Sequence, residues 1–266
     1  MTMEDKCIQQ SKHLEKGNKL FRKAVSLLSK NSVHFWVDAG TLLGLTRDQS
    51  LIPWDSDIDL GVWKDSVTEE EIIRIFEEEN FVVESLLSEG RPCINCFSQD
   101  SACEFYVDIA FYSREDGYAL YESYYRDYEH LSIFQKMILF LANRLQSKQS
   151  QEKGSGSHKN QLKINAYKAI EALIYQIIPQ NLRLSIAKKL MSFLERTLPK
   201  FKVVYKYPEH FYDELKQVEL LGVAVNVPND TESFLETAYG QDWRIPKDYG
   251  NKWWLGATEV DTSPMM

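Results

Sequence analysis

Cysteine is scarce in this sequence, with four residues among 266. So few thiols exclude the disulfide framework of a small secreted domain. Cys93 and Cys96 have the C-x-x-C spacing of many zinc sites, but the second pair of ligands that such a site needs is missing. Only Cys103 lies nearby, and no histidine occurs between positions 35 and 129. We therefore expect buried or idle thiols rather than a zinc site.

Positive charge and long apolar runs are also in short supply. The 31 Lys and Arg are outnumbered by 39 Asp and Glu, for a net charge of −8. Because nucleic-acid binding needs a basic face, we expect no nucleic-acid partner. The longest apolar run, "MILFLA" at 137–142, is far shorter than the roughly 18 residues of a membrane span. The N-terminal stretch also lacks the apolar core of a secretory signal. The expected location is the cytoplasm, with the inner face of the membrane as an open alternative.

The first 115 residues predict a compact α/β unit. Apolar residues follow a helical spacing through residues 4–30, and Thr68 with Glu71 forms a capping box for a helix at 69–79. Short apolar or alternating stretches predict four strands. The strand segments are "HFWVDAG", "SDIDLGVW", "FVVESLL" and "ACEFYVDIAFYS".

Residues 116–200 predict a helical insert, with a flexible loop where the sequence is polar near 147–160. Three segments carry apolar stripes at helical spacing. They are "HLSIFQKMILFLANRL", "INAYKAIEALIYQIIP" and "NLRLSIAKKLMSFLERTLP". The stripes indicate helix packing or a face that contacts a membrane or a lipid-linked acceptor. After them, "KVVYKY", "VAVNVP" and "TESFLETAY" predict two strands and a helix, so residues 201–266 are expected to pack back on the first unit.

The stretch "IPWDSDIDLG" at 52–61 places Asp55, Asp57 and Asp59 at every second position. On a strand, residues i and i+2 point to the same face, so Asp57 and Asp59 project together. Two neighbouring carboxylates repel each other unless a cation lies between them, and hard oxygen ligands suit Mg²⁺ or Mn²⁺. Asp108 stands in the middle of an otherwise apolar strand, where an acid is costly without a partner. It is therefore the candidate third ligand.

Upstream, Gly40 and Thr41 stand at a predicted strand-to-helix junction, where backbone N–H groups can bind a phosphate. Arg47 is the basic residue close by and could hold a phosphate oxygen. A phosphate cradle, an acid pair and a third acid together predict a phosphoryl-transfer site. An EF-hand loop does not fit, because Leu60 and Ser66 occupy its glycine and glutamate positions. Turn or capping acids on a solvated edge remain the alternative.

The segment "AGTLLGLTRDQSLIPWDSDIDLGV" closely resembles the signature of the LicD family, which includes fukutin and fukutin-related protein. Near the C-terminus, "AYGQDWRIP" is similar to the family's Y-G-x-x-W-x-x-P. The resemblance implies an α/β (α+β) nucleotidyltransferase-like fold, a mixed sheet with flanking helices. It also implies transfer of a phospho-alcohol, such as phosphocholine or ribitol phosphate, from a CDP-linked donor to a sugar hydroxyl.

Carried onto this sequence, the resemblance places the donor phosphates at Gly40 and Thr41 and the metal at Asp57, Asp59 and Asp108. Arg47 matches the family's arginine, and Tyr239, Gly240, Trp243 and Pro246 match the C-terminal signature. Trp54 or Trp243 could stack on the cytosine or anchor the packing. The sequence departs from many relatives at Ser56, where they have a third consecutive acid, and at "DQS", where they often have a basic residue and glycine.

The expected function is thus a metal-dependent phosphotransferase that acts on a glycan or lipid-linked sugar and releases CMP. Asp57 and Asp59 are expected to hold the metal, and Asp108 to complete the site or accept the proton of the attacking hydroxyl. Three alternatives stay open. They are a nucleotidyltransferase that joins an NTP to a small alcohol, a GT-A-like glycosyltransferase, and a non-catalytic scaffold.

Overall fold

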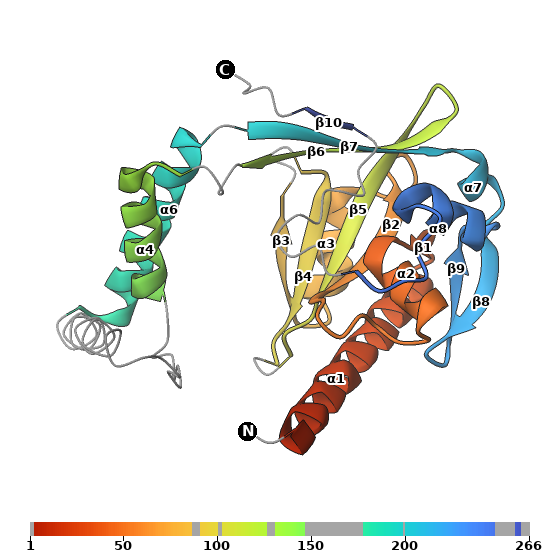
Figure 1. The fold of residues 1–266 in the computed structure, drawn as a ribbon, viewed down its shortest axis with the longest axis horizontal. Helices are drawn as coiled ribbons and strands as arrows, with labels where there is room; N and C mark the ends of the chain where they lie inside the picture. The colour runs from red at the N-terminus through yellow and green to blue at the C-terminus, as the bar shows by residue number, and fades with distance from the viewer. Residues whose placement is uncertain are drawn as a thin grey trace. The chain divides into compact units, whose positions relative to one another are not determined.

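The structure is a computed structural model, and it describes residues 3–86, 91–100, 103–126, 131–146, 178–198, 200–247 and 259–261. The chain divides into two units, the first formed by residues 1–125 and 202–262 and the second by residues 126–201. Figure 1 labels the helices and strands. The helices are α1 (Met3–Lys30), α2 (Ala39–Arg47), α3 (Glu69–Glu77), α4 (Ile133–Gln146), α6 (Gln180–Thr197), α7 (His210–Asp213) and α8 (Thr231–Tyr239).

The first unit is built on an eight-stranded mixed sheet. Its strands are β1 (Phe35–Val37), β2 (Asp57–Trp63), β3 (Phe81–Ser85), β4 (Cys93–Ser98), β5 (Tyr106–Glu115), β6 (Tyr118–Arg126), β7 (Lys200–Pro208) and β10 (Glu259–Asp261). The central pair, β2 and β5, is parallel, whereas β1 pairs antiparallel with β2 and β4 pairs antiparallel with β5. The strands β8 (Lys216–Leu220) and β9 (Val223–Val227) form a separate hairpin. The predicted α/β fold with a mixed sheet is confirmed.

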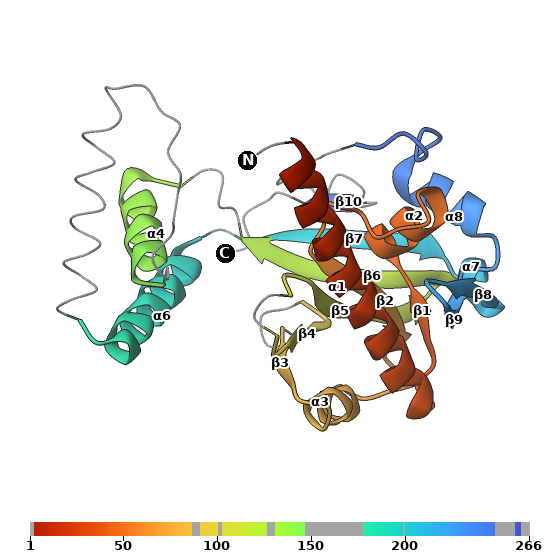
Figure 2. The same cartoon turned by 90° about the horizontal axis from the view of Figure 1, so that it is seen from below.

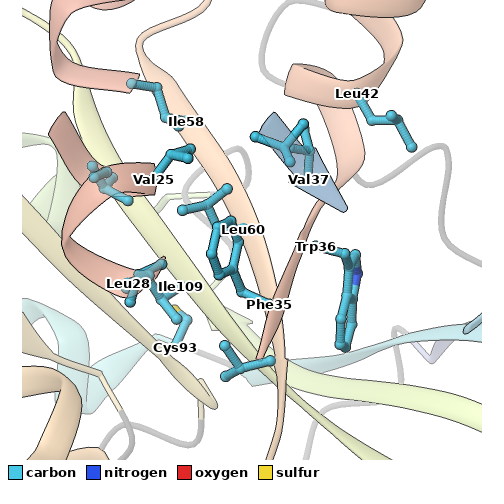
Figure 3. Close-up of a cluster of buried hydrophobic side chains, with 14 of the residues drawn as sticks. Val25, Leu28, Phe35, Trp36, Val37, Leu42, Ile58, Leu60, Cys93 and Ile109 are labelled. Atoms are coloured by element: carbon cyan, nitrogen blue, oxygen red, sulfur yellow. The ribbon is translucent and has the colours of Figure 1, made fainter. Parts of the chain in front are cut away.

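Helix α1 packs against the sheet of the first unit, as Figure 2 shows. Its apolar face meets the buried side chains of the central strands, because the helical spacing seen in the sequence puts Val25 and Leu28 on one side. Figure 3 shows both residues beside Leu60 and Ile109 in this core. The buried faces of β2 and β5 therefore pack against α1, and this packing fixes the position of the two strands.

A glycine on β2 lets a tryptophan lie flat against the sheet. Gly61 pairs with Trp36 across β1 and β2, and a β-carbon at Gly61 would fall 2.2 Å from the Trp36 ring. Trp36 is fully buried and also contacts the rings of Trp63, Tyr112 and Tyr212. The close approach of this ring depends on the missing side chain.

Several local predictions are confirmed. Thr68 caps α3 and exchanges hydrogen bonds with Glu71, which is the predicted capping box. The predicted helix "TESFLETAY" is α8, and its start is capped by Asp230, which accepts the backbone N–H of Ser233. Cys93 and Cys96 are buried free thiols. They are three residues apart on one strand and therefore point to opposite faces, which does not suit a shared zinc ion.

The strand β6 was not predicted from the sequence. It follows β5 through a tight turn in which Asp116 and Gly117 have φ of 50° and 78°. Asp-Gly with both residues in the left-handed region is the preferred connection of a two-residue hairpin. The dipeptide was therefore a readable signal for a strand pair where the sequence analysis expected the helical insert to begin.

The second unit contains α4 and α6, which pack on each other through Leu131, Ile138, Leu194 and Leu198. Gln135 on α4 donates to the carbonyl and hydroxyl oxygens of Thr197 at the end of α6. The predicted loop near 147–160 and the helix predicted from "INAYKAIEALIYQIIP" lie outside the described residues. In the part of the chain that the structure describes, no helix is long and apolar enough to cross a membrane.

Candidate active site

The carboxylates of interest lie side by side because β2 and β5 are parallel neighbours. Their register pairs Asp59 with Asp108 and Asp57 with Tyr106. Residues opposite each other on parallel strands point to the same face, so Asp57, Asp59 and Asp108 all project from one side of the sheet. Asp55 stands just before β2. The structure thus brings together acids that are about fifty residues apart in the sequence.

Each of these carboxyl groups makes ionisation of the others less favourable. Burial raises the pKa of Asp108 to about 7, and the negative charge of Asp57 adds to the shift. Burial, followed by a hydrogen bond and repulsion from Asp57, raises the pKa of Asp55 to about 8. The pKa of Asp59 is raised well above its usual range by burial and by the charges of the other three acids. A bound cation would relieve this repulsion.

Thr41 fixes the orientation of Asp59. Its backbone N–H and its hydroxyl donate to Oδ2 of Asp59 at 3.0 and 3.2 Å. The same hydroxyl accepts the backbone N–H of Asp59 at 2.8 Å. Thr41 lies in the first turn of α2, so a carboxylate from β2 occupies part of the helix N-terminus where the sequence predicted a phosphate.

Gly40 makes room for the acids. A β-carbon at this position would lie 2.9 Å from Oδ2 of Asp55 and 3.4 Å from Oδ2 of Asp59. The glycine is therefore needed for the close approach of two carboxylates to the start of α2. This contact also places Asp55 inside the site, whereas the sequence predicted Asp55 only as an outer member of the acid run that orients the strand or a ligand water.

Carboxylates are the type of ligand that a hard divalent cation takes, but within the described residues they do not close around one. Oδ1 of Asp108 is buried, and within the described residues it has no hydrogen-bond partner. Asp57 accepts a long hydrogen bond of 3.4 Å from the Tyr106 hydroxyl. Over the same described ranges, no three His, Cys, Asp or Glu side chains converge tightly enough to form a complete metal site. Carboxylate oxygens are the ligands that Mg²⁺ prefers. A cation would also offset the repulsion between these carboxylates and give the unpaired Oδ1 of Asp108 a partner.

The acids face a cavity of about 780 Å³. All the predicted site residues except Thr41 line it. Thr41 contributes indirectly, because it donates a hydrogen bond to the Asp59 carboxylate. Tyr239 and Trp243 enter from the end of α8 and the segment that follows it. Trp54 is 56% exposed, whereas Trp243 is 5% exposed and has the Arg244 guanidinium 4.1 Å from its ring centre. Of the two, Trp54 is the ring that a base could reach.

Arg47 lines the cavity, but its guanidinium group is hydrogen-bonded to the side chain of the adjacent residue, Asp48. Its Nε and Nη2 donate to the Asp48 carboxylate at 2.6–3.0 Å. A bidentate grip on a phosphate through the same edge would require Asp48 to release it. Two other cationic side chains, Arg91 and Lys247, also line the cavity, and the sequence analysis missed both. The negative charge of Asp108 is partly balanced by Arg91.

Asp38 is a further acid that the sequence analysis did not single out. It is 2% exposed, lies between β1 and α2 and lines the same cavity. Burial raises its pKa, and a hydrogen bond with the Tyr112 side chain counteracts part of the shift. The signal was available in "HFWVDAG", where an acid follows directly on an apolar strand. Ala39 after it has φ of 40°, a conformation that costs an alanine about 1 kcal/mol, so the turn into α2 is strained.

Residues 32–149 match the family described as LicD/FKTN/FKRP, nucleotidyltransferase domain. The match covers β1 to α4 and includes Asp57, Asp59 and Asp108. It confirms the resemblance seen in the sequence over that segment.

Individual relatives are similar over shorter stretches. Uncharacterized protein RP689 of Rickettsia prowazekii is 37% identical over 65 residues, which are 24% of this chain and 24% of that protein. The human ribitol 5-phosphate transferase FKRP is 36% identical over 69 residues, 24% of this chain and 14% of its own. The human ribitol-5-phosphate transferase FKTN is 31% identical over 61 residues, 23% of this chain and 13% of its own. The alignments therefore span less than a third of these relatives' lengths.

Proposed function

Given a segment that matches the LicD/FKTN/FKRP nucleotidyltransferase domain, we propose that this protein is a phosphotransferase acting on a glycan or glycolipid. In this proposal it moves a phospho-alcohol, such as phosphocholine or ribitol phosphate, from a CDP-linked donor to a sugar hydroxyl. Two relatives carry the name of ribitol 5-phosphate transferase, which supports this substrate class. The observation that carries the proposal is the pairing of Asp59 with Asp108 at one edge of a cavity, with Asp55 and Asp57 beside them.

Asp57, Asp59 and Asp108 would hold the divalent metal, Mg²⁺ or Mn²⁺. Once bound there, such an ion stabilises the charge that builds on the leaving phosphate. Thr41 keeps the Asp59 carboxylate in one orientation through its hydroxyl and N–H, so this ligand is already positioned. The metal would also become a partner for Oδ1 of Asp108, which is buried and accepts no hydrogen bond from the described residues.

The chemical step is an attack by the acceptor hydroxyl on the β-phosphorus of the donor. A new oxygen–phosphorus bond forms, the bond from the β-phosphorus to the bridging oxygen breaks, and CMP leaves with the electron pair. The hydroxyl proton passes to a carboxylate, for which Asp108 is the candidate because it lines the cavity beside Asp59. Arg91 and Lys247 line the same cavity and would balance the charge of the donor phosphates, for which Lys247 would have to exchange its ion pair with Asp242 (2.6 Å) for the phosphate.

The cavity also suits a donor with a base and an alcohol at its ends. Its volume of about 780 Å³ is within the range of cofactor-sized sites. Trp54 at the exposed edge could stack on the cytosine. The tyrosines that line the wall offer hydroxyl groups and ring faces to a sugar. They are Tyr106, Tyr112, Tyr121, Tyr205, Tyr207 and Tyr239.

The test is to incubate the protein with Mg²⁺ and a panel of CDP-choline, CDP-ribitol, CDP-glycerol, NTPs and nucleotide-sugars. Slow release of CMP from a CDP-alcohol supports the proposal. The family's description as a nucleotidyltransferase domain favours one rival, NTP transfer, which would release pyrophosphate instead. Release of a nucleoside diphosphate from a nucleotide-sugar would indicate a glycosyltransferase. No turnover with any donor would leave the scaffold alternative.

A further inference from the structure

The second unit leaves an apolar helical face uncovered by the residues that the structure describes. On α4, Ile133, Phe134, Met137 and Leu141 are exposed by 82%, 64%, 65% and 42%. These positions follow the i, i+1, i+4, i+8 spacing that puts side chains on one side of a helix. A different side of α4 carries the buried residues Ile138, Ala142 and Leu145, of which Ile138 packs with Leu194 of α6. The helix therefore has two apolar faces, and one of them contacts no part of the described chain closely enough to be buried.

Helix α6 adds a similar face that mixes apolar and basic side chains. Leu182 and Phe193 are exposed by 52% and 49%. Eleven residues make almost exactly three turns of helix, so these two lie on the same side, with Lys189 and Arg196 close to them. Lysine and arginine at the border of an apolar face can extend their charged ends to a polar boundary while their stems lie on apolar surface.

The charge of this unit is opposite to that of the rest of the chain. Residues 126–201 contain 13 Lys and Arg against 5 Asp and Glu, whereas the remaining residues contain 18 against 34. Within α4 and α6, six basic side chains stand against the single acid Glu195. This asymmetry disfavours a second copy of the unit as the partner, because two strongly basic faces would repel each other.

We propose that the exposed face of α4 and α6 binds the surface of an anionic lipid bilayer. Exposed Phe, Ile, Leu and Met beside Lys and Arg are the two features that hold a helix in the plane of a membrane interface. Anionic headgroups attract basic side chains near the membrane surface, and apolar side chains add burial below the headgroups. This mode of binding needs no membrane-spanning helix. It would bring a lipid-linked acceptor to the same surface as the enzyme.

The experiment is flotation of the full chain with vesicles of phosphatidylcholine alone or mixed with phosphatidylglycerol. We expect binding to the anionic vesicles that is lost in high salt, and little binding to the neutral ones. The variant Phe134→Ser/Met137→Ser should lose the apolar contribution. The variant Lys189→Glu/Arg196→Glu should weaken binding by about tenfold or more. A matched control is Val82→Ser, which removes a side chain that is 57% exposed on β3 of the first unit and should bind as the wild type does.

Three results would overturn the proposal. The first is failure of the wild type to bind anionic vesicles, as expected if another segment of the chain covers this face. The second is equal loss of binding in the Val82→Ser control. The third is concentration-dependent self-association that Phe134→Ser/Met137→Ser abolishes, which would assign the face to a second copy. Circular dichroism of each variant checks that the helices persist. None of these readouts depends on the proposed transferase activity.

Discussion

The Oδ2 atom of Asp59 accepts two hydrogen bonds from Thr41, at 3.0 Å from the backbone N–H and at 3.2 Å from the hydroxyl. The Thr41 hydroxyl also accepts the backbone N–H of Asp59, so one threonine at the start of α2 holds both the carboxylate and the backbone of β2. This arrangement links the G-T-L-L-G segment to the acids at the level of individual atoms. It assigns to Thr41 the positioning of a proposed metal ligand.

Replacing Thr41 with valine should therefore reduce turnover more than a surface change would. The substitution keeps the shape but removes the hydroxyl, which leaves the Asp59 N–H without its acceptor and costs about 1–3 kcal/mol of stability. Turnover should fall by about tenfold to a hundredfold, as for other residues that orient metal ligands. Thr41→Ser keeps the hydroxyl and should restore most of both. Equal activity of the valine and serine variants in a CMP-release assay would contradict this role.

Gly40→Ala should disturb the acids directly. The new β-carbon would lie 2.9 Å from Oδ2 of Asp55, so this carboxylate has to move. We expect lower turnover at the saturating metal concentration and a weaker apparent affinity for Mg²⁺. In an Asp55→Ala background the obstacle is gone, and Gly40→Ala should then add little further effect. If both changes reduced activity independently, the proposed contact would not be the cause.

Gly61→Ala should destabilise the fold. Its β-carbon would overlap the Trp36 ring, which is fully buried and cannot shift easily. Overpacking of this kind costs about 1–3 kcal/mol, or more where backbone must move. Urea unfolding measures the loss, and a Trp36→Phe background, which removes part of the indole, should reduce it. An unchanged unfolding midpoint would show that the sheet accommodates the methyl group.

The metal-free protein should lose stability as the pH rises from about 4 to about 8, because the Asp55 carboxyl group loses its proton more easily in the unfolded chain than in the folded protein. Its pKa is raised from 3.8 in the unfolded chain to about 8 in the folded protein. Between these values the folded state binds the extra proton, so this carboxyl stabilises the fold at low pH and its contribution is lost as the pH approaches 8. Urea unfolding in EDTA at about pH 5 and about pH 8 tests this.

Asp55→Asn is the comparison for that experiment, because an amide cannot titrate. Its stability should depend less on pH than that of the wild type, and Mg²⁺ should restore part of the wild-type stability near pH 8 if the ion binds the folded state. Parallel pH profiles of the two proteins would contradict the assigned pKa shift.

Much of the fold could be predicted from local signals. The capping box of Thr68, the alternating acids of β2 and the helix α8 are all determined by neighbouring residues, so a short window was enough. The turn at Asp116 and Gly117 was equally local, and the tyrosine-rich sequence of β6 after it favours a strand, so both signals were readable but were missed.

The site was only partly predictable, because its members come from distant segments. The sequence marked Asp108 as a costly acid, but its pairing with Asp59 depends on the register of two parallel strands. No spacing rule predicts two of its contacts. One is the close approach of the Asp55 carboxylate to Gly40, and the other is the ion pair between Arg47 and Asp48. Arg91 and Lys247 reach the cavity from loops, where periodicity carries no information.

Whether the acids of β2 hold a metal for phospho-alcohol transfer can be measured directly. Mg²⁺-dependent release of CMP from a CDP-alcohol should be compared between the wild type and Asp57→Asn, with circular dichroism and urea unfolding to confirm that the variant folds. We expect release by the wild type and a loss of about a thousandfold in the variant, since metal stabilisation of the transition state contributes several kcal/mol. Unchanged CMP release from a folded Asp57→Asn protein would show that Asp57 holds no metal that the transfer requires.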